Sequence, residues 1–204
     1  MERIEKEREY IRDYWFKDHV ATVVEHDGVT ILDWRKPGTS MYAVKYVMVG
    51  NKLFISGDIG DAVYDLTWSA TMESFNDVNL SYFTGKLSCS SRDRWNFNSE
   101  KACKELDEWL DERIHDLEDD RKGIQVVLDI HRDLQRAIRE YDSESVYKHE
   151  VWRCYQEYDD TDAEEFEVIS DFGRHLPNEF IAYLLGIQMA NEQLKKTELL
   201  EVAE

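Results

Sequence analysis

Residues 42–56, YAVKYVMVGNKLFIS, decide the fold of the first half of the chain. Two runs rich in β-branched and aromatic side chains, Tyr42–Val49 and Lys52–Ser56, flank the pair Gly50-Asn51. Such runs favour extended backbone, and glycine beside asparagine permits the positive φ angles of a tight turn. The stretch therefore predicts a β-hairpin.

More strands are expected on both sides of this hairpin. Runs at 19–24 and 29–34, joined by His26-Asp27-Gly28, predict a second hairpin, and a fifth strand is expected at 62–68. Before them, the spacing of apolar side chains predicts a short helix at 5–16. Together these elements predict a small, mostly antiparallel sheet whose apolar side chains need a covering layer.

A long amphipathic helix is expected at 99–120. Asn98-Ser99 offers an N-cap, and the residues that follow place apolar side chains in one arc and carboxylates in the opposite half. We expect the apolar face of this helix to cover the sheet. Further helices are predicted at 124–141, 143–158 and 166–194, the last interrupted near 173–177.

These elements predict an α+β fold with two parts. The first is a sheet-containing subdomain with an N-terminal helix, residues 1–97, and the second is an acidic helical subdomain, residues 98–204. The boundary is placed where the period of the apolar side chains changes from that of strands to that of helices.

The charge of the chain is unevenly distributed. Among 204 residues, 44 acidic and 25 basic side chains give a formal net charge of −19. Residues 1–102 hold 16 acidic and 13 basic side chains, whereas residues 103–204 hold 28 and 12. Long-range repulsion therefore disfavours direct binding of nucleic acid or of an anionic membrane, and the second half is the part suited to a basic partner.

The cysteines and the first residues predict a cytoplasmic protein. Cys89, Cys103 and Cys154 are an odd number without paired spacing, which favours reduced thiols and no cofactor. Residues 1–12 carry four Glu and three Arg and lack the apolar stretch of a signal peptide. No apolar run approaches the ~18 residues that a membrane-spanning helix needs.

The usual catalytic motifs are missing from the sequence. It contains no P-loop, dinucleotide-binding, serine-elbow or HExxH pattern, so the chain is predicted not to be an enzyme. The alternative is a metal-dependent enzyme that holds Mg²⁺ with Asp58, Asp61 and Asp65, since this ion takes oxygen ligands. A glycine-bearing turn between two strands explains the same segment without a metal.

Carboxylates on the predicted helix at 99–120 and in the acidic run after 158 are the candidate partner-binding groups. That helix is ~33 Å long at ~1.5 Å per residue, a length over which one DNA strand carries ~10 phosphates. A groove that holds nucleic acid could accept such a surface as a decoy, although an ordinary solvated helix face is the other interpretation. The candidate residues are Asp107, Glu108, Asp111, Glu112, Glu118, Asp119, Asp159, Asp160, Asp162, Glu164 and Glu165.

Part of the chain resembles uncharacterised proteins encoded by bacteriophages and prophages. The residues that carry the resemblance lie between 41 and 110, about a third of the chain, and are Met41–Tyr46, Leu53–Tyr64, Tyr82–Leu87 and Trp109-Leu110. No catalytic motif accompanies it. The resemblance implies a setting in which small acidic phage proteins bind and block a host machine, including nucleic-acid-guided defence complexes.

The sequence thus favours a non-enzymatic acidic inhibitor of the phage type. We expect it to act as a DNA mimic that occludes a basic, nucleic-acid-handling surface of a host protein, as an anti-CRISPR or other anti-defence protein does. Two alternatives stay open, the metal-dependent enzyme and a protein that sequesters a small molecule. The oligomeric state and the apolar side chains that anchor the partner cannot be named from the sequence.

Overall fold

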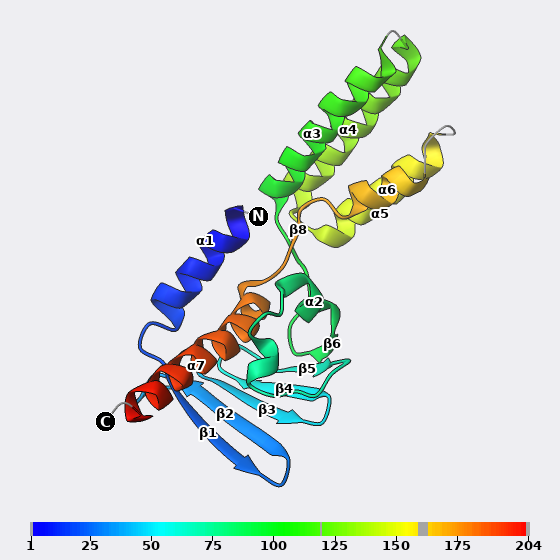
Figure 1. The fold of residues 1–204 in the computed structure, drawn as a ribbon. Helices are drawn as coiled ribbons and strands as arrows, with labels where there is room; N and C mark the ends of the chain where they lie inside the picture. Colours follow the sequence, from blue (N-terminus) through cyan, green and yellow to red (C-terminus); the bar gives the residue numbers. More distant parts are fainter. Residues whose placement is uncertain (1, 119, 159–162, 203–204) are drawn as a thin grey trace. The chain divides into compact units, whose positions relative to one another are not determined.

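The computed structural model describes residues 2–118, 120–158 and 163–202 (Figure 1). The chain forms two compact units, one of residues 1–94 and 176–204 and the other of residues 95–175. A six-stranded antiparallel sheet lies in the N-terminal half and helices predominate in the C-terminal half, which confirms the predicted α+β class.

The sheet of the first unit is a meander whose strands follow one another in sequence order, each antiparallel to the next. The turn between the first two strands uses Asp27 and Gly28, both at positive φ, as a tight hairpin requires. The first five strands lie where the sequence predicts them, and the sixth was not predicted. The strands are β1 Val20–His26, β2 Val29–Arg35, β3 Val44–Val49, β4 Lys52–Gly57, β5 Ala62–Asp65 and β6 Leu87–Ser90.

Helix α7, Asn178–Val202, covers one face of this sheet (Figure 1). All eight residues from Phe180 to Ile187 are buried, as expected of a helix that is apolar all round. Its side chains join those of β2–β5 in one core. The same unit contains α1 Glu2–Tyr10, the π-helical turn η1 Ile11–Trp15, η2 Glu73–Phe75 and α2 Leu80–Gly85.

Two expectations are corrected by this arrangement. The helix predicted at 99–120 does not cover the sheet, because its apolar side chains belong to the core of the second unit. The unit boundaries also differ from the predicted division at 97/98: residues 176–204 belong with the sheet. The physical reason is that the apolar side chains of α7 are stable only when buried, and they are buried in the same core as those of the sheet.

The described residues of the second unit form four helices, α3 Ser99–Leu117, α4 Arg121–Tyr141, α5 Glu144–Glu157 and α6 Ala163–Ser170. A two-stranded pairing of β7 Asn96–Phe97 with β8 Arg174–His175 joins its ends. The predicted helix at 99–120 ends at Leu117, because Glu118 adopts a positive φ and Asp120 caps α4. The core residues include Ala102, Leu106, Ile130, Leu134, Ile138, Tyr147, Cys154 and Ile169.

Candidate functional site

Some of the carboxylates predicted to bind a partner are engaged within the helical unit. Asp107 Oδ1 lies 2.7 Å from His131 Nε2 and accepts a hydrogen bond from Gln135 at 2.6 Å, which ties α3 to α4. Glu108 pairs with Lys104 of the same helix at 3.3 Å. These contacts interrupt the row of negative charge along α3.

Other predicted carboxylates of α3 are exposed. Asp111, Glu112 and Glu118 form no ion pair with the described residues. Asp111 and Glu112 lie on α3, whereas Glu118 directly follows its last residue, Leu117. The helix therefore offers a partner a shorter acidic surface than its composition suggests.

Glu165 of α6 has an internal structural role. Its Oε1 accepts a hydrogen bond from Trp109 Nε1 at 2.8 Å and lies 2.8 Å from Arg113 Nε, both on α3. Its neighbour Glu164 is exposed. The other predicted members, Asp119, Asp159, Asp160 and Asp162, lie outside the described residues.

The segment considered for a metal is a turn in the first unit. Asp58 Oδ2 accepts a hydrogen bond from the backbone N of Tyr42 at 2.8 Å. Asp65 pairs with Lys52 at 2.6 Å and accepts a hydrogen bond from Asn51. Asp61 is exposed. Within the described part of the chain, no three metal-binding side chains come together.

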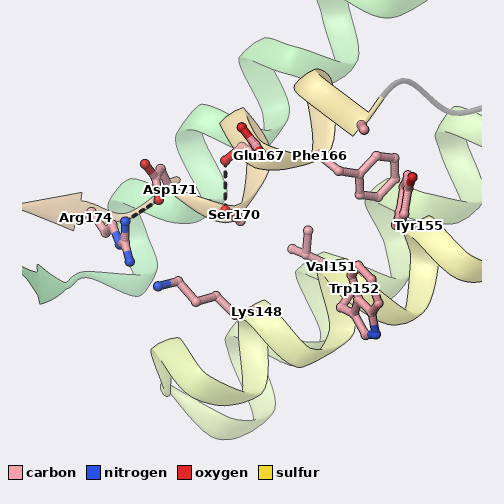
Figure 2. Close-up of a pocket in the computed structure, with 10 residues that line it drawn as sticks. Lys148, Val151, Trp152, Tyr155, Phe166, Glu167, Ser170, Asp171 and Arg174 are labelled. Carbon is pink, nitrogen blue, oxygen red and sulfur yellow. Dashed lines mark hydrogen bonds and ion pairs between the residues drawn. The ribbon is translucent and has the colours of Figure 1, made fainter.

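A pocket of about 590 Å³ lies between α5 and α6 in the helical unit (Figure 2). Each helix contributes a stripe of side chains at the spacing i, i+3, i+4, i+7, which places them on one helix face. The stripes are Lys148, Val151, Trp152 and Tyr155 on α5, and Ala163, Phe166, Glu167 and Ser170 on α6; Asp171 and Arg174 complete the wall.

One end of this α5–α6 pocket is aromatic. The Tyr155 ring lies 5.5 Å from that of Trp152 on its own helix and 5.5 Å from that of Phe166 on α6. Figure 2 shows Tyr155 and Phe166 together at this end, with Trp152 beside them. Trp152 is 56% exposed although it packs against Tyr155. Large indole surface is thus left in contact with solvent.

The other end of the pocket is polar, and its cations are neutralised. Glu144 Oε1 lies 2.8 Å from Lys148 Nζ and 2.7 Å from Arg174 Nε, and Arg174 also bonds Asp171. Burial tends to raise the pKa of Glu144, but the hydrogen bonds from Lys148 and Arg174 outweigh it and lower that pKa. Glu167 forms no ion pair with the described residues. An incoming ligand therefore meets an uncompensated carboxylate.

The pocket combines an aromatic surface with charged side chains. Its aliphatic hydroxyl group, on Ser170, donates to the Glu167 carbonyl oxygen at 2.8 Å, and the described residues that line it include no histidine. Cys154 on the neighbouring turn is buried, which raises the pKa of its thiol to about 11 and keeps it protonated at neutral pH. The arrangement can hold an apolar group beside a cation.

This pocket was not predicted from the sequence. The inward face of α5 is formed by Tyr147, Val151 and Cys154, which are buried. The available signal was Trp152, a large aromatic residue one position off that inward face. Its partner helix α6 is too short for its period to be recognised beside the longer run of α7.

Comparison with known proteins finds no matching family model, no matching curated protein and no matching solved structure. Within the described residues, every helix is too short or too polar to cross a membrane. The function must therefore be argued from the surfaces of the two units.

Proposed function

We propose that the protein is a non-enzymatic binding protein whose helical unit docks on a basic protein partner. An apolar side chain of the partner, flanked by Lys or Arg, enters the α5–α6 pocket. The observation that carries the proposal is that one pocket is lined both by the exposed aromatic ring of Trp152 and by Glu167, whose carboxylate forms no ion pair with the described residues.

The apolar part of the pocket supplies the affinity that charge alone cannot. Charged contacts at an interface rim mainly raise association rates and specificity, whereas buried aromatic anchors account for most of the binding free energy. Trp152 and Phe166 form such an anchor site, with Glu167 at its edge. A partner that offered only basic side chains would leave the aromatic surface of the pocket exposed to solvent and would gain no free energy from its burial.

The electrostatics of the unit favour a basic partner over other occupants. Residues 95–175 carry 24 acidic and 11 basic side chains, a formal net charge of −13, against 20 and 14, or −6, for the rest of the chain. Exposed carboxylates on α3, such as Asp111 and Glu112, add to the field that attracts a cation.

If the basic surface of the partner normally binds nucleic acid, binding of this protein would inhibit the partner. A partner covered by this unit has its phosphate-binding residues occupied by carboxylates, and the resemblance to phage proteins suggests a defence protein of the host as target. This setting places the protein in the host cytoplasm, where its cysteines, free in the structure, would stay reduced.

The test is affinity capture from host lysate with the full chain and two matched variants. Wild type and Tyr141→Ala are expected to recover the same basic protein at low salt, since Tyr141 is 60% exposed at the end of α4, away from the pocket lining. Trp152→Ala is expected to weaken binding by at least about 30-fold, the loss of ~2 kcal/mol typical of an aromatic anchor.

Three results would contradict the proposal. One is that no basic protein is recovered at low salt. Another is that Trp152→Ala recovers the partner as well as Tyr141→Ala does. The third is binding that high salt leaves unchanged, because the proposed rim contacts are charged and screened by ions.

A further inference from the structure

The face of the sheet opposite α7 carries a continuous row of apolar side chains. Because side chains alternate along a strand and neighbouring strands pair in register, residues directly opposite each other share a face. The register joins Val24 to Ile31, Ile31 to Val47, Val47 to Phe54, Phe54 to Val63 and Val63 to Cys89, so the row crosses all six strands.

These side chains are in contact with solvent. Val24 is 57% exposed, Phe54 42% and Ile31 36%. A second row adds Val29 opposite Val49, and Val49 is also exposed. Single exposed apolar residues are common on protein surfaces, but a contiguous patch marks an interaction surface. We call the two rows the apolar sheet face.

The charges around the apolar sheet face nearly cancel. Arg35 pairs with Asp33 at 2.6 Å, and Lys52 pairs with Asp65 at 2.6 Å. Lys45, opposite Asp33 on the next strand, forms no ion pair with the described residues. A chain of net charge −19 repels its own copies, yet this face carries three basic and two acidic groups. Two copies that meet through this face therefore add no local excess of negative charge at the contact.

We propose that the apolar sheet face is a homodimer interface whose occupant is the same face of a second copy. Two sheets can pack face to face about 10 Å apart, as in a β-sandwich. A two-fold axis through the face sets each apolar row against an apolar row, which satisfies the self-complementarity of a symmetric dimer.

The size of the face sets the strength of the dimer. Five inter-strand spacings of ~4.8 Å by about six residues at ~3.3 Å, the length of the longer strands, give on the order of 500 Å² per copy for the whole face of the sheet, which includes the polar row beside the apolar sheet face. The pair buries on the order of 1,000 Å², the lower limit for a specific interface. The dimer is therefore reversible and depends on concentration.

This inference concerns the first unit and does not rest on the proposed partner of the second. The test is sedimentation equilibrium of the full chain from about 2 to 200 μM, with a folding check by circular dichroism. Wild type is expected to shift from 24.2 kDa toward twice that mass. Phe54→Lys is expected to raise the dissociation constant at least about tenfold, because two ammonium groups would be buried near the axis.

Ile31→Thr provides a milder second variant that keeps a β-branched side chain, and it should weaken the dimer in the same direction. Tyr141→Lys is the matched control on the helical unit and should dimerise like wild type. A chain that stays monomeric at 200 μM overturns the proposal, as does a dimer that both sheet variants leave intact. Loss of the dimer in the Tyr141 control would place the interface elsewhere.

Discussion

Gly186 of α7 lies directly against the hydroxyl group of Tyr46 on β3. A Cβ atom at position 186 would clash with that oxygen, and would lie 3.3 Å and 3.4 Å from the rings of Trp34 and Phe16. The absence of a side chain therefore lets the helix approach the sheet closely. Tyr46 is fully buried, which raises the pKa of its phenol well above the ordinary value.

Gly186→Ala is expected to lower the free energy of unfolding by about 1–3 kcal/mol, because overpacking outweighs the ~1 kcal/mol that alanine gains in a helix. Urea denaturation measures the change. Gly85→Ala is the control, because a Cβ there meets nothing within 4 Å. Tyr46→Phe removes the clashing oxygen, so the double variant should recover part of the loss; strict additivity of the two changes would contradict this packing.

The buried His19 is expected to make stability depend on pH. Burial lowers its pKa from 6.5, and the backbone carbonyl of Tyr42, 3.1 Å from Nε2, opposes that shift only in part. The unfolded chain thus binds a proton that the folded chain does not. Above pH 6.5 His19 is mostly neutral in both states and does not alter the free energy of unfolding. As the pH drops from 6.5 toward the pKa of the folded state, protonation of the unfolded chain lowers the free energy of unfolding by at most ~1.4 kcal/mol per pH unit.

Denaturation curves at pH 7.5, 6.5 and 5.5 measure this effect of His19. Other groups titrate in the same range, so the comparison is with His19→Gln, which keeps a donor for the Tyr42 carbonyl. The variant should lose less stability on acidification than wild type. Equal slopes for the two proteins would show that His19 does not couple folding to pH.

Glu165 should matter for folding more than for binding. Glu165→Ala removes the acceptor of Trp109 Nε1 and the partner of Arg113, and is expected to cost about 1–3 kcal/mol of stability. Glu112→Ala, an exposed carboxylate of α3, should change stability by less than about 0.5 kcal/mol. Chemical denaturation monitored by tryptophan fluorescence measures both. Similar values for the two variants would argue against the internal role.

The three cysteines should differ in reactivity. Cys89 is exposed, whereas Cys154 is buried with its thiol pKa raised to about 11. At pH 7.5, N-ethylmaleimide is expected to label Cys89 at least about 100-fold faster than Cys154, which reacts through unfolding. Peptide mass spectrometry follows the time course of labelling. Comparable rates at the two sites would mean that the helical unit opens readily.

The strands and most helices could be predicted because local patterns determine them. Gly50-Asn51 between two apolar runs was sufficient for the β3–β4 hairpin, and Asn98 indeed caps α3. What covers the sheet depends on long-range contacts: α7 fits there because Gly186 admits Tyr46, a match that no local period reveals. The α5–α6 pocket was likewise not predicted, because its lining residues on the two helices, such as Trp152 and Phe166, come to one pocket only through the fold.

The proposed function assigns the attraction of a basic partner to exposed carboxylates of α3 and its retention to the aromatic pocket. Once such a partner is identified, substitutions at these two places should therefore change different rate constants. Asp111→Asn with Glu112→Gln should slow association about 2- to 5-fold at low salt and leave dissociation unchanged, since exposed charges act on the encounter. Trp152→Ala should instead raise the dissociation rate. Surface plasmon resonance at two salt concentrations separates the rates, with Glu73→Gln plus Asp77→Asn on the sheet unit as the charge-matched control. If the α3 pair changes only dissociation, those carboxylates lie inside the interface and contribute to anchoring, contrary to this division.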